Sequence, residues 1–471
     1  MKKAVFPLEE DKPREECGVF GIYAPGEDVA RHTYYGLCAL QHRGQESAGI
    51  AVANGHEIKI HKNMGLVTEV FAEDIFKQLK GNLAIGHVRY STTGESSIAN
   101  AQPLISPYNS GSIALAHNGH LVDAVVVRSG LLKKGLTLQT TSDSEVLLKF
   151  IASFSSISLP DALKKCMAKL RGAYSLVVMT EKQLIGMRDR RGMRPLCLGR
   201  FGKGYVLASE TCALDSIGAE FIRDIKPGEI VCIDENGLNS LQVTPACHRS
   251  LCIFEYIYLA RPDSIIDGEQ VKTVRLALGR QLARECPTHA DVVVPVPDSG
   301  KLAALGYATA LGTPLQEGLK KNLWVGRNFI QPTQILREKT IKLKFRPVKE
   351  VVQSKSVALV DDSLVRGTTG RQIVKMLRDA GVKEVHLLVS SPPIRYPCYF
   401  GIDISDRKQL LAARYSLEEI KSYIGVDSLH YLSLENVLQV MQAPAEEFCL
   451  ACFNGEYPIE IAALGKCYKI I

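Results

Sequence analysis

The sequence predicts two domains of different class: an α+β domain of stacked strand layers and helices, followed by an α/β domain built on a parallel sheet. Its 471 residues exceed what one typical core holds. From Cys17 to about residue 245, strand-like runs rich in Val, Ile and Tyr mix with a few helical patterns. After residue 250, short apolar strands alternate with amphipathic helices, which is typical of a parallel sheet. We therefore predict domains at 17–248 and 249–471.

Individual elements follow from the same patterns. In the first domain we expect strands at 17–24, 83–91, 112–119, 173–180 and 204–211, and helices at 142–154 and 159–172. Ser142 or Asp143 is a suitable cap for the first of these helices. In the second domain, two strand-loop-helix units and a further strand are expected at 290–312, 356–381 and 382–390.

Composition narrows the class of protein. Hydrophobic residues make up 46% of the chain and charged residues 23%, with a net charge of +7 from scattered Lys and Arg. This balance suits an anionic small substrate and indicates no nucleic-acid partner. Thirteen cysteines at irregular spacing, without a signal peptide, favour reduced thiols, metal ligands or a nucleophile in the cytoplasm. No apolar run approaches the roughly 18 residues of a membrane span, so no membrane partner is expected.

A phosphate-binding motif lies at 357–370. An apolar strand ends in two adjacent carboxylates, Asp361 and Asp362, at the edge where open α/β sheets bind ligands. The loop that follows enters a helix and consists of Arg366, Gly367, Thr368, Thr369 and Gly370. Backbone amides at a helix start bind phosphate, and carboxylates hold ribose hydroxyls or Mg²⁺. Capping acids and a simple turn are the alternative. The motif resembles the phosphoribosylpyrophosphate (PRPP) signature of type I phosphoribosyltransferases.

Four further motifs follow Cys17 in order. They are LQHRGQES at 40–47, GHVRYSTTG at 86–94, AHNGHL at 116–121 and TSDSE at 141–145. Taken singly, each has an ordinary explanation as a turn, a surface charge or a helix cap. Together, behind a Cys-Gly strand, they resemble the glutaminase domain of N-terminal-nucleophile amidotransferases. The resemblance implies the layered sandwich of N-terminal-nucleophile hydrolases.

This resemblance implies that Cys17 attacks the side-chain amide of glutamine. The thiol needs a base, and no histidine in this region is clearly paired with it. A free α-amino group, whose ordinary pKa is about 7.7 to 8.0, suits that task. Since this group exists only on an N-terminal residue, we expect residues 1–16 to be a cleaved propeptide.

The same resemblance assigns the other glutamine-site residues. Asn118 and Gly119 would donate the side-chain amide and the backbone N–H that stabilise the oxyanion. Arg89 and Asp143 would bind the α-carboxylate and α-ammonium of glutamine. In the phosphoribosyltransferase part, the loop at 294–300 implies that Ser299 joins Asp361 and Asp362 at a Mg²⁺ site, with Asp298 close behind.

Two cysteines form a Cys-x-x-Cys pair, Cys449 and Cys452. Alone, the pair is ambiguous among zinc, redox and iron-sulfur sites, and buried core is the default for single cysteines. From Cys17 to about Pro458, however, the chain resembles the glutamine PRPP amidotransferases. One branch of that family carries a 4Fe-4S cluster and a propeptide, and its ligands correspond to Cys252, Cys398, Cys449 and Cys452. Cys247 is the main rival to Cys252. It is expected to be structural, like Cys38 and Cys166.

The family resemblance implies a cytoplasmic enzyme that transfers ammonia from glutamine to C1 of PRPP. The products are 5-phosphoribosylamine, glutamate and pyrophosphate, in the first committed step of purine synthesis. The resemblance also implies feedback inhibition by purine nucleotides and a homotetramer or dimer. A basic loop after Lys321, with Arg327 and Lys344, is expected to close over PRPP. Two alternatives remain: a PRPP-sensing regulator with a silent glutaminase, and an N-terminal-nucleophile peptidase or acylase that leaves the Asp361 motif unused.

Overall fold

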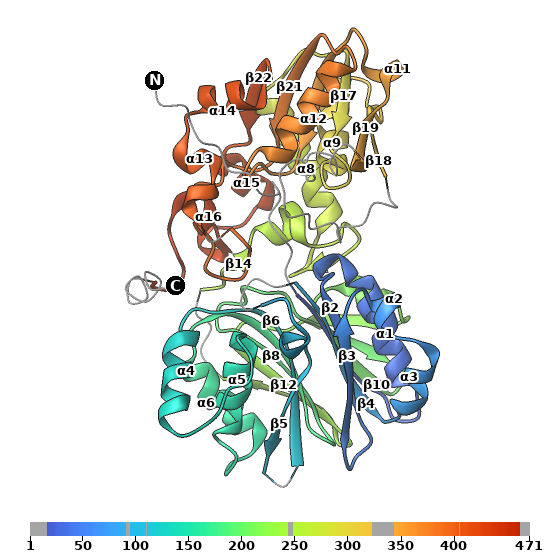
Figure 1. Ribbon diagram of the computed structural model, residues 1–471, viewed down its shortest axis with the longest axis vertical. Helices are drawn as coiled ribbons and strands as arrows, with labels where there is room; N and C mark the ends of the chain where they lie inside the picture. Colours follow the sequence, from blue (N-terminus) through green and yellow to red (C-terminus); the bar gives the residue numbers. More distant parts are fainter. Residues whose placement is uncertain are drawn as a thin grey trace.

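The computed structural model describes six stretches of the chain: residues 17–90, 95–109, 111–243, 248–322, 343–404 and 406–461. The expected propeptide, Cys247 and Arg327 lie outside these stretches. The molecule has two parts stacked along its long axis (Figure 1). The first part is a four-layer sandwich in which two sheets face each other and helices cover both outer faces.

The sandwich contains two antiparallel sheets in the described part of the chain. One has the order β11-β9-β10-β1-β4-β2-β3, and the other β13-β12-β8-β7-β6-β5. The strands span Gly18–Tyr23 (β1), Ser47–Ala53 (β2), Ile58–Met64 (β3), Leu83–Arg89 (β4), Leu104–Tyr108 (β5), Gly111–Leu121 (β6), Gly172–Met179 (β7), Leu184–Arg188 (β8), Cys197–Phe201 (β9), Gly204–Ala208 (β10), Glu220–Asp224 (β11), Glu229–Asp234 (β12) and Gly237–Gln242 (β13).

Short helices cover the sandwich. They span Val29–Ala39 (α1), Val67–Val70 (α2), Glu73–Gln78 (α3), Ala124–Lys133 (α4), Asp143–Ala152 (α5), Leu159–Lys169 (α6) and Thr211–Asp215 (α7), with 3₁₀ turns at Gln41–Arg43 and Ile98–Asn100. Helices α1 to α3 flank one sheet, and α4 to α6 flank the other (Figure 1). Ser142, one of the two predicted caps, accepts a hydrogen bond from the backbone N–H of Glu145 and fixes the start of α5.

The core between the two sheets is apolar and tightly packed. Val19 and Ile85 from one sheet are fully buried in the same cluster as Ala116 and Val177 from the other. A Cβ atom on Gly21 would lie only 2.5 Å from Cγ1 of Val177. The sheets therefore approach too closely for a side chain at this position of β1, which explains the Gly-spaced pattern of the strand.

The second part has a parallel sheet of order β17-β20-β21-β22, as predicted. These strands span Val292–Pro295, Ser356–Asp361, Glu384–Val389 and Ser428–Tyr431. Its helices are α8 (Val271–Glu285), α9 (Lys301–Leu311), α11 (Lys349–Val352), α12 (Thr368–Asp379), α13 (Leu411–Arg414), α14 (Leu417–Ile424), α15 (Leu434–Met441) and α16 (Ala451–Asn454). Helices α8 and α9 pack on one face of the sheet, and α12 and α14 on the other.

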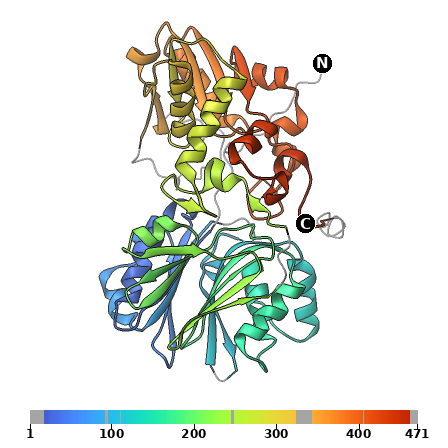
Figure 2. The ribbon, with the colours of Figure 1, turned by 180° about the vertical axis from the view of Figure 1, so that it is seen from behind.

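Short strand pairs and turns complete this part. They are β14 (Leu251–Cys252) with β23 (Phe448–Cys449), β15 (Ile265–Ile266) with β16 (Glu269–Gln270), β18 (Leu319–Lys321) with β19 (Phe345–Pro347), a π-helical turn at Glu255–Leu259, and 3₁₀ turns at Arg407–Gln409 and Ala445–Glu447. Strands β14 and β23 pair although they lie far apart in sequence, so the C-terminal segment packs beside the beginning of this part (Figure 2).

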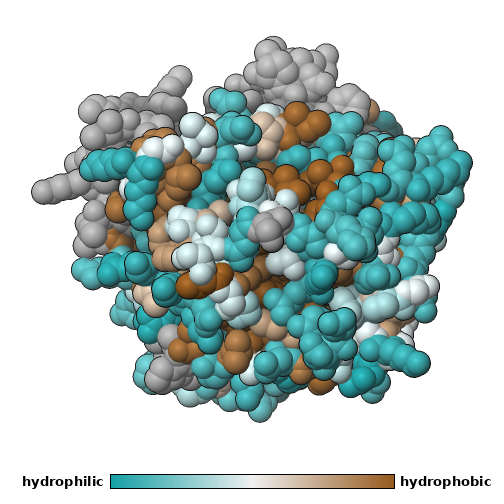
Figure 3. All heavy atoms as spheres, turned by 90° about the horizontal axis from the view of Figure 1, so that it is seen from below, coloured by the Kyte–Doolittle hydropathy of each residue, from teal (hydrophilic) through white to brown (hydrophobic). Residues whose placement is uncertain are grey.

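Buried ion pairs join the two parts of the molecule. Arg43 of the sandwich contacts Glu255, and Nη1 of Arg188 lies 2.8 Å from Oδ1 of Asp267. The predicted domain boundary at 248/249 falls between β13 and β14 and stays a prediction. In the described residues, no helix is long and apolar enough to cross a membrane. The end of the molecule formed by the two N-terminal sheets mixes hydrophilic and apolar side chains (Figure 3).

Candidate functional site

Cys17 and Arg89 lie side by side at one end of the sandwich. Gly18 of β1 pairs with Val88 of β4, so the antiparallel register sets the preceding Cys17 against Arg89. The Cys17 thiol donates a hydrogen bond of 3.5 Å to the carbonyl oxygen of Tyr90. This end of β1 is therefore held next to the predicted carboxylate-binding arginine.

Strand β6 brings Asn118 to the same end. Nε2 of His87, on β4, lies 3.0 Å from the carbonyl oxygen of His117, directly before Asn118. The Asn118 side chain is fully buried, and neither of its polar atoms has a hydrogen-bond partner among the residues that the structure describes. An unmade hydrogen bond of this kind costs roughly 1–3 kcal/mol, so it points to a ligand that completes it. This is the donor expected of an oxyanion hole.

Gly119 could not be another residue. Its φ is +135°, and a Cβ atom would lie 2.0 Å from the carbonyl oxygen of Ala173 on the neighbouring strand. The close approach of β6 and β7 thus requires glycine here. The backbone of Gly119 is fixed beside the Asn118 amide, as the predicted pair of donors requires.

Asp143 begins α5 and faces the same region. Its Oδ2 accepts a 3.0 Å hydrogen bond from the Leu121 backbone N–H and lies 3.3 Å from Nδ1 of His120. Burial alone would raise the pKa of Asp143, but the hydrogen bond with His120 and the electrostatic influence of the nearby His117 lower it well below its usual range. Asp143 is therefore a carboxylate at neutral pH, as binding of an ammonium group requires.

Arg89 is also held by protein groups. Its side chain is buried, its Nη1 donates a 3.2 Å hydrogen bond to the carbonyl oxygen of Glu95, and the same nitrogen lies 3.8 Å from Oε2 of Glu46. The structure thus brings together all five predicted glutamine-site residues at the ends of β1, β4, β6 and α5. The neighbours His120 and Glu46 were within the quoted motifs, but their roles depend on contacts across the fold.

Two buried histidines connect the elements that form this site. Burial lowers the pKa of His87 to about 3, against the opposing effect of its hydrogen bond to His117. Burial also lowers the pKa of His117, whose Nδ1 lies 3.0 Å from Oγ of Ser144. The Gln102 side chain accepts from the His117 backbone N–H at 2.8 Å. Both rings are neutral near pH 7 and connect β4, β6 and α5 around Asn118.

The second candidate site lies at the end of β20. The Asp362 backbone N–H donates to Oδ1 of Asp361 at 2.9 Å, and Ser363 Oγ donates to Oδ2 of Asp362 at 2.7 Å. Both carboxylates are buried. Burial lowers the pKa of Arg275 on α8 to about 10, while the charge of Asp362 acts to raise it. Arg275 therefore supplies positive charge near the acidic pair, a partner that the local sequence did not reveal.

The loop after Asp362 is shaped for a helix-start phosphate site. Gly367 caps α12 with φ of +73°, and a Cβ atom there would lie 2.4 Å from Cδ1 of Leu411. Helix α12 therefore begins at Thr368, earlier than predicted, and Thr368 and Thr369 form its first turn. Arg366 donates hydrogen bonds to Gln409 Oε1, at 3.0 and 2.7 Å, and to the carbonyl oxygen of Asp403 at 3.5 Å, so its side chain braces the loop.

Strand β17 delivers Ser299 next to this loop. The Val296 backbone N–H donates to the Val360 carbonyl oxygen at 2.8 Å, and a Cβ atom on Gly300 would lie 3.3 Å from Cα of Asp361. Asp298 turns instead to Lys301, at 2.8 Å, and to Lys321.

Partial burial would raise the pKa of Asp298, but its hydrogen bonds from Lys301 and Lys321 lower it. One or two carboxylates with nearby hydroxyls and substrate oxygens are typical Mg²⁺ ligands, so Asp361, Asp362 and Ser299 fit that ion. Within the described stretches, no group of three or more acidic, His or Cys side chains is arranged to hold a metal ion as it stands.

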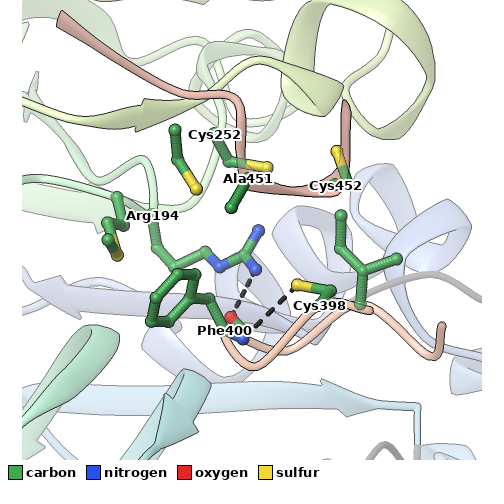
Figure 4. A pocket seen from close by; sticks show the side chains of 9 residues that line it. Arg194, Cys252, Cys398, Phe400, Ala451 and Cys452 are labelled. Carbon is green, nitrogen blue, oxygen red and sulfur yellow. Dashed lines mark hydrogen bonds between the residues drawn. The ribbon is translucent and has the colours of Figure 1, made fainter. Parts of the chain in front are cut away.

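Four cysteines line one small cavity at the junction of the two parts. Cys252 and Cys449 are directly paired residues of β14 and β23, and Cys398 and Cys452 line the same cavity. Figure 4 shows Cys252, Cys398 and Cys452 around this space. The structure thus brings together the four predicted ligands from three distant segments.

The donor set of this cavity fits an iron-sulfur cluster. Burial and then the neighbouring Cys252, Cys449 and Cys398 raise the pKa of Cys452 well above its usual value. As thiolates, four cysteines gathered in this way would need a metal group to balance their charge, and a 4Fe-4S cluster takes four cysteines, each on its own iron. The predicted structural Cys166 packs in the core around α6, where burial raises its pKa to about 12.

Known proteins resemble this chain over nearly its whole length. A family model described as "Glutamine amidotransferase domain" matches residues 87–216. "Amidophosphoribosyltransferase" of Synechococcus elongatus is 51% identical, covering 98% of this chain and 95% of the relative. That of Bacillus subtilis is 48% identical, covering 95% of each.

Solved structures agree with these sequence matches. "Glutamine phosphoribosylpyrophosphate (PRPP) amidotransferase from B. subtilis complexed with ADP and GMP" has a TM-score of 0.89 and 48% identity, and it covers 94% of this chain and 98% of its own. "Structure of the allosteric regulatory enzyme of purine biosynthesis" has a TM-score of 0.90, with 48% identity over 94% of this chain and 97% of its own. These matches confirm the predicted fold class and family. The chain belongs to the amidophosphoribosyltransferase family.

Proposed function

We propose that this enzyme forms 5-phosphoribosylamine, glutamate and pyrophosphate from glutamine, PRPP and water, the first committed step of de novo purine nucleotide synthesis. The observation that carries the proposal is the presence, in one chain, of a nucleophile site and a phosphoribosyl site. About half of the residues are identical to named amidophosphoribosyltransferases over nearly full length. Neither site alone would account for a reaction that consumes both substrates.

The glutamine half-reaction uses the groups gathered around Cys17. Its Sγ attacks the side-chain carbonyl carbon of glutamine, and the oxyanion accepts hydrogen bonds from the Asn118 amide and the Gly119 N–H. The C–N bond then breaks, ammonia leaves with a proton, and a thioester remains. Water hydrolyses the thioester to glutamate and restores the thiol. Arg89 and Asp143 hold the two charged ends of the amino acid.

The base in this scheme is the α-amino group of Cys17. The Tyr90 carbonyl oxygen, to which the thiol donates, is an acceptor but cannot serve as a base at neutral pH. An N-terminal amine has a pKa near 8 and sits within reach of its own thiol. The proposal therefore includes removal of residues 1–16, with Cys17 as the first residue of the working enzyme.

The synthase half-reaction takes place beside Asp361. Ammonia attacks C1 of PRPP, the bond to pyrophosphate breaks, and a proton is lost from nitrogen. We assign the ribose hydroxyls to Asp361 and Asp362, and the 5-phosphate to the loop at 366–370. Mg²⁺, held by Asp361, Asp362 and Ser299, would neutralise charge on the leaving pyrophosphate. The predicted closure of the basic loop after Lys321 falls largely outside the described residues and stays a prediction.

Two further features belong to this proposal. Cys252, Cys398, Cys449 and Cys452 would hold a 4Fe-4S cluster that fastens β14 and β23 together. Purine nucleotides would act as feedback inhibitors, which is supported by the Bacillus subtilis structure described as complexed with ADP and GMP. A cytoplasmic homotetramer or dimer remains the expected form of the enzyme.

The test is a product assay on protein purified without oxygen. With glutamine and PRPP together, we expect equal amounts of glutamate and pyrophosphate. A PRPP-sensing regulator would bind PRPP without releasing glutamate, and a peptidase or acylase would need no PRPP, so either result would contradict the proposal. The intact mass of the same sample reports whether residues 1–16 are absent, and its iron and sulfide content reports the cluster.

A further inference from the structure

Arg194 places a buried cation at the four-cysteine cavity. It follows β8 in the sandwich, yet its side chain is fully buried at the junction and lines the cavity with the cysteines. Figure 4 shows its guanidinium group reaching into the space between Cys252 and Cys398. It donates a hydrogen bond to the carbonyl oxygen of Phe400, whose own N–H donates to Sγ of Cys398 at 3.3 Å. The backbone of Phe400 thus connects the arginine to a predicted cluster ligand.

A buried carboxylate faces the same guanidinium. Nη1 of Arg194 lies 3.6 Å from Oε1 of Glu255, which is fully buried. Arg43 contacts the same carboxylate and also Glu210. Burial alone would raise the pKa of Glu210, but the charges of Arg43 and His42 lower it well below its usual value. A line of alternating charges therefore runs from the cavity into the sandwich.

Arg43, in the middle of this line, also packs beside the glutamine site. Arg43 precedes Gly44, and a Cβ atom on Gly44 would lie 2.7 Å from the backbone nitrogen of Arg89. A Cβ atom on Gly18 would lie 3.5 Å from Cβ of Arg43, next to Cys17. Packing around Arg43 therefore leaves little space for adjustment.

We propose that Arg194 sets the charge environment of the iron-sulfur cluster, and that Glu255 opposes it. The inference rests on the proposed cluster. A cluster held by four thiolates is negatively charged, and it gains one more negative charge when a one-electron donor reduces it. In a water-poor site, a neighbouring guanidinium stabilises the reduced form more than the oxidised one. Arg194 is therefore a positioning residue that raises the reduction potential, while Glu255 lowers it.

The experiment compares reduction potentials of the intact enzyme. Anaerobic protein is titrated with dithionite, and the reduced cluster is followed by electron paramagnetic resonance. Arg194→Gln is expected to shift the potential to more negative values, and Glu255→Gln to more positive values. Arg194→Lys keeps the charge and should shift it less than Arg194→Gln. Arg200→Gln is the matched control, because Arg200 is an exposed arginine on β9 and its loss should leave the potential unchanged.

Opposite shifts in the Arg194→Gln and Glu255→Gln variants would support the proposal, because a purely structural role does not predict opposite signs. Unchanged potentials in cluster-loaded variants would overturn it. Should Arg194→Gln fail to fold or load the cluster, Arg194→Lys and Glu255→Gln decide between these outcomes. If anaerobically purified wild-type protein contains no iron and sulfide, the proposed cluster itself is wrong. This result differs from a loaded cluster whose potential does not change, which contradicts only the role of Arg194 and Glu255.

Discussion

The two substrate sites of this enzyme are built in different ways. The glutamine site uses the ends of strands from two facing sheets and the first turn of α5, and buried histidines connect these elements. Its charged groups already have protein partners, since Asp143 faces His120 and Arg89 faces Glu46. The charged side chains of this site are therefore held in place before glutamine arrives.

The phosphoribosyl site instead consists of loops at the ends of parallel strands. Two adjacent carboxylates are buried there, and Arg275 acts on Asp362 across the core. Repulsion between such neighbours is relieved when a cation and substrate hydroxyls bind. The comparison teaches that the glutamine site is preorganised for covalent chemistry. The phosphoribosyl site, by contrast, depends on the bound cation and substrate to offset the charge of its carboxylates.

Removing the nucleophile should separate the two sites most clearly. Cys17→Ala is expected to lower the glutamine-dependent rate by about 10⁴-fold or more, because covalent catalysis has no substitute there. The rate with added ammonia should stay near wild type, since ammonia reaches the second site without Cys17. Both rates are measured as pyrophosphate release. Loss of the ammonia-dependent rate would mean that the two sites are not separable as described.

The oxyanion donor gives the next largest effect. Asn118→Ala should reduce kcat for glutamine hydrolysis by about 10² to 10³-fold with little change in KM, because the amide acts mainly in the transition state. Removing the unpartnered buried amide should not destabilise the fold. Thermal unfolding checks this point. An equal rise in KM with unchanged kcat would place Asn118 in ground-state binding instead.

The acidic pair should affect the reactions with the two nitrogen sources alike. Asp361→Asn is expected to lower both the ammonia-dependent and the glutamine-dependent rates by about 10²-fold, since hydrogen bonds to a charged group contribute roughly 1.5–3 kcal/mol. Basal glutamine hydrolysis should remain. Ser112→Ala, far from this site on β6, is a suitable control. A loss restricted to the glutamine-dependent rate would contradict the assignment.

Local sequence patterns predicted more of the phosphoribosyl site than of the glutamine site. The Asp361 motif is continuous, so its strand, loop and helix follow from local patterns, although the early start of α12 depends on the packing of Gly367 against Leu411. Cys17, Asn118 and Asp143 could be assigned to one site only through the family resemblance. They lie far apart in sequence, and only the register of the folded strands brings them together. Arg194 and Arg275 could not be predicted. Their partners come from other parts of the chain and meet them only in the folded core.

Asp143 permits a test of the preorganised charge. Asp143→Asn should raise KM for glutamine by about 10 to 100-fold through loss of a charge-assisted hydrogen bond, and leave the ammonia-dependent rate unchanged. Because the neighbouring His120 and Leu121 N–H hold the pKa of Asp143 below its usual range, the carboxylate stays ionised at pH 5. Lowering the pH from 8 to 5 should therefore not raise the KM of the wild-type enzyme for glutamine in the way that Asp143→Asn does. Glutamine titrations in Asp143→Asn and wild type at both pH values decide this.

The junction between the two parts gives the smallest effect, on stability alone. Burial, and then the charge of Asp267, raise the pKa of Asp224 on β11 to about 7, against the lowering influence of Arg188. The ordinary value is about 3.9. Between these values the folded state binds more protons than the unfolded state, so the free energy of unfolding should fall as the pH rises from about 4 to about 7.

Asp224→Asn removes this proton-linked cost. Above pH 7 it should raise the free energy of unfolding by about 2 to 4 kcal/mol, and the gain should shrink towards pH 4, where the folded carboxyl is protonated and the unfolded one is about half protonated. Urea unfolding at pH 5 and pH 8 measures the difference, with both catalytic rates as controls that should not change. An equal effect at the two pH values would show that Asp224 acts through packing. The junction would then be a fixed scaffold between the preorganised site and the substrate-ordered one, rather than a pH-sensitive one.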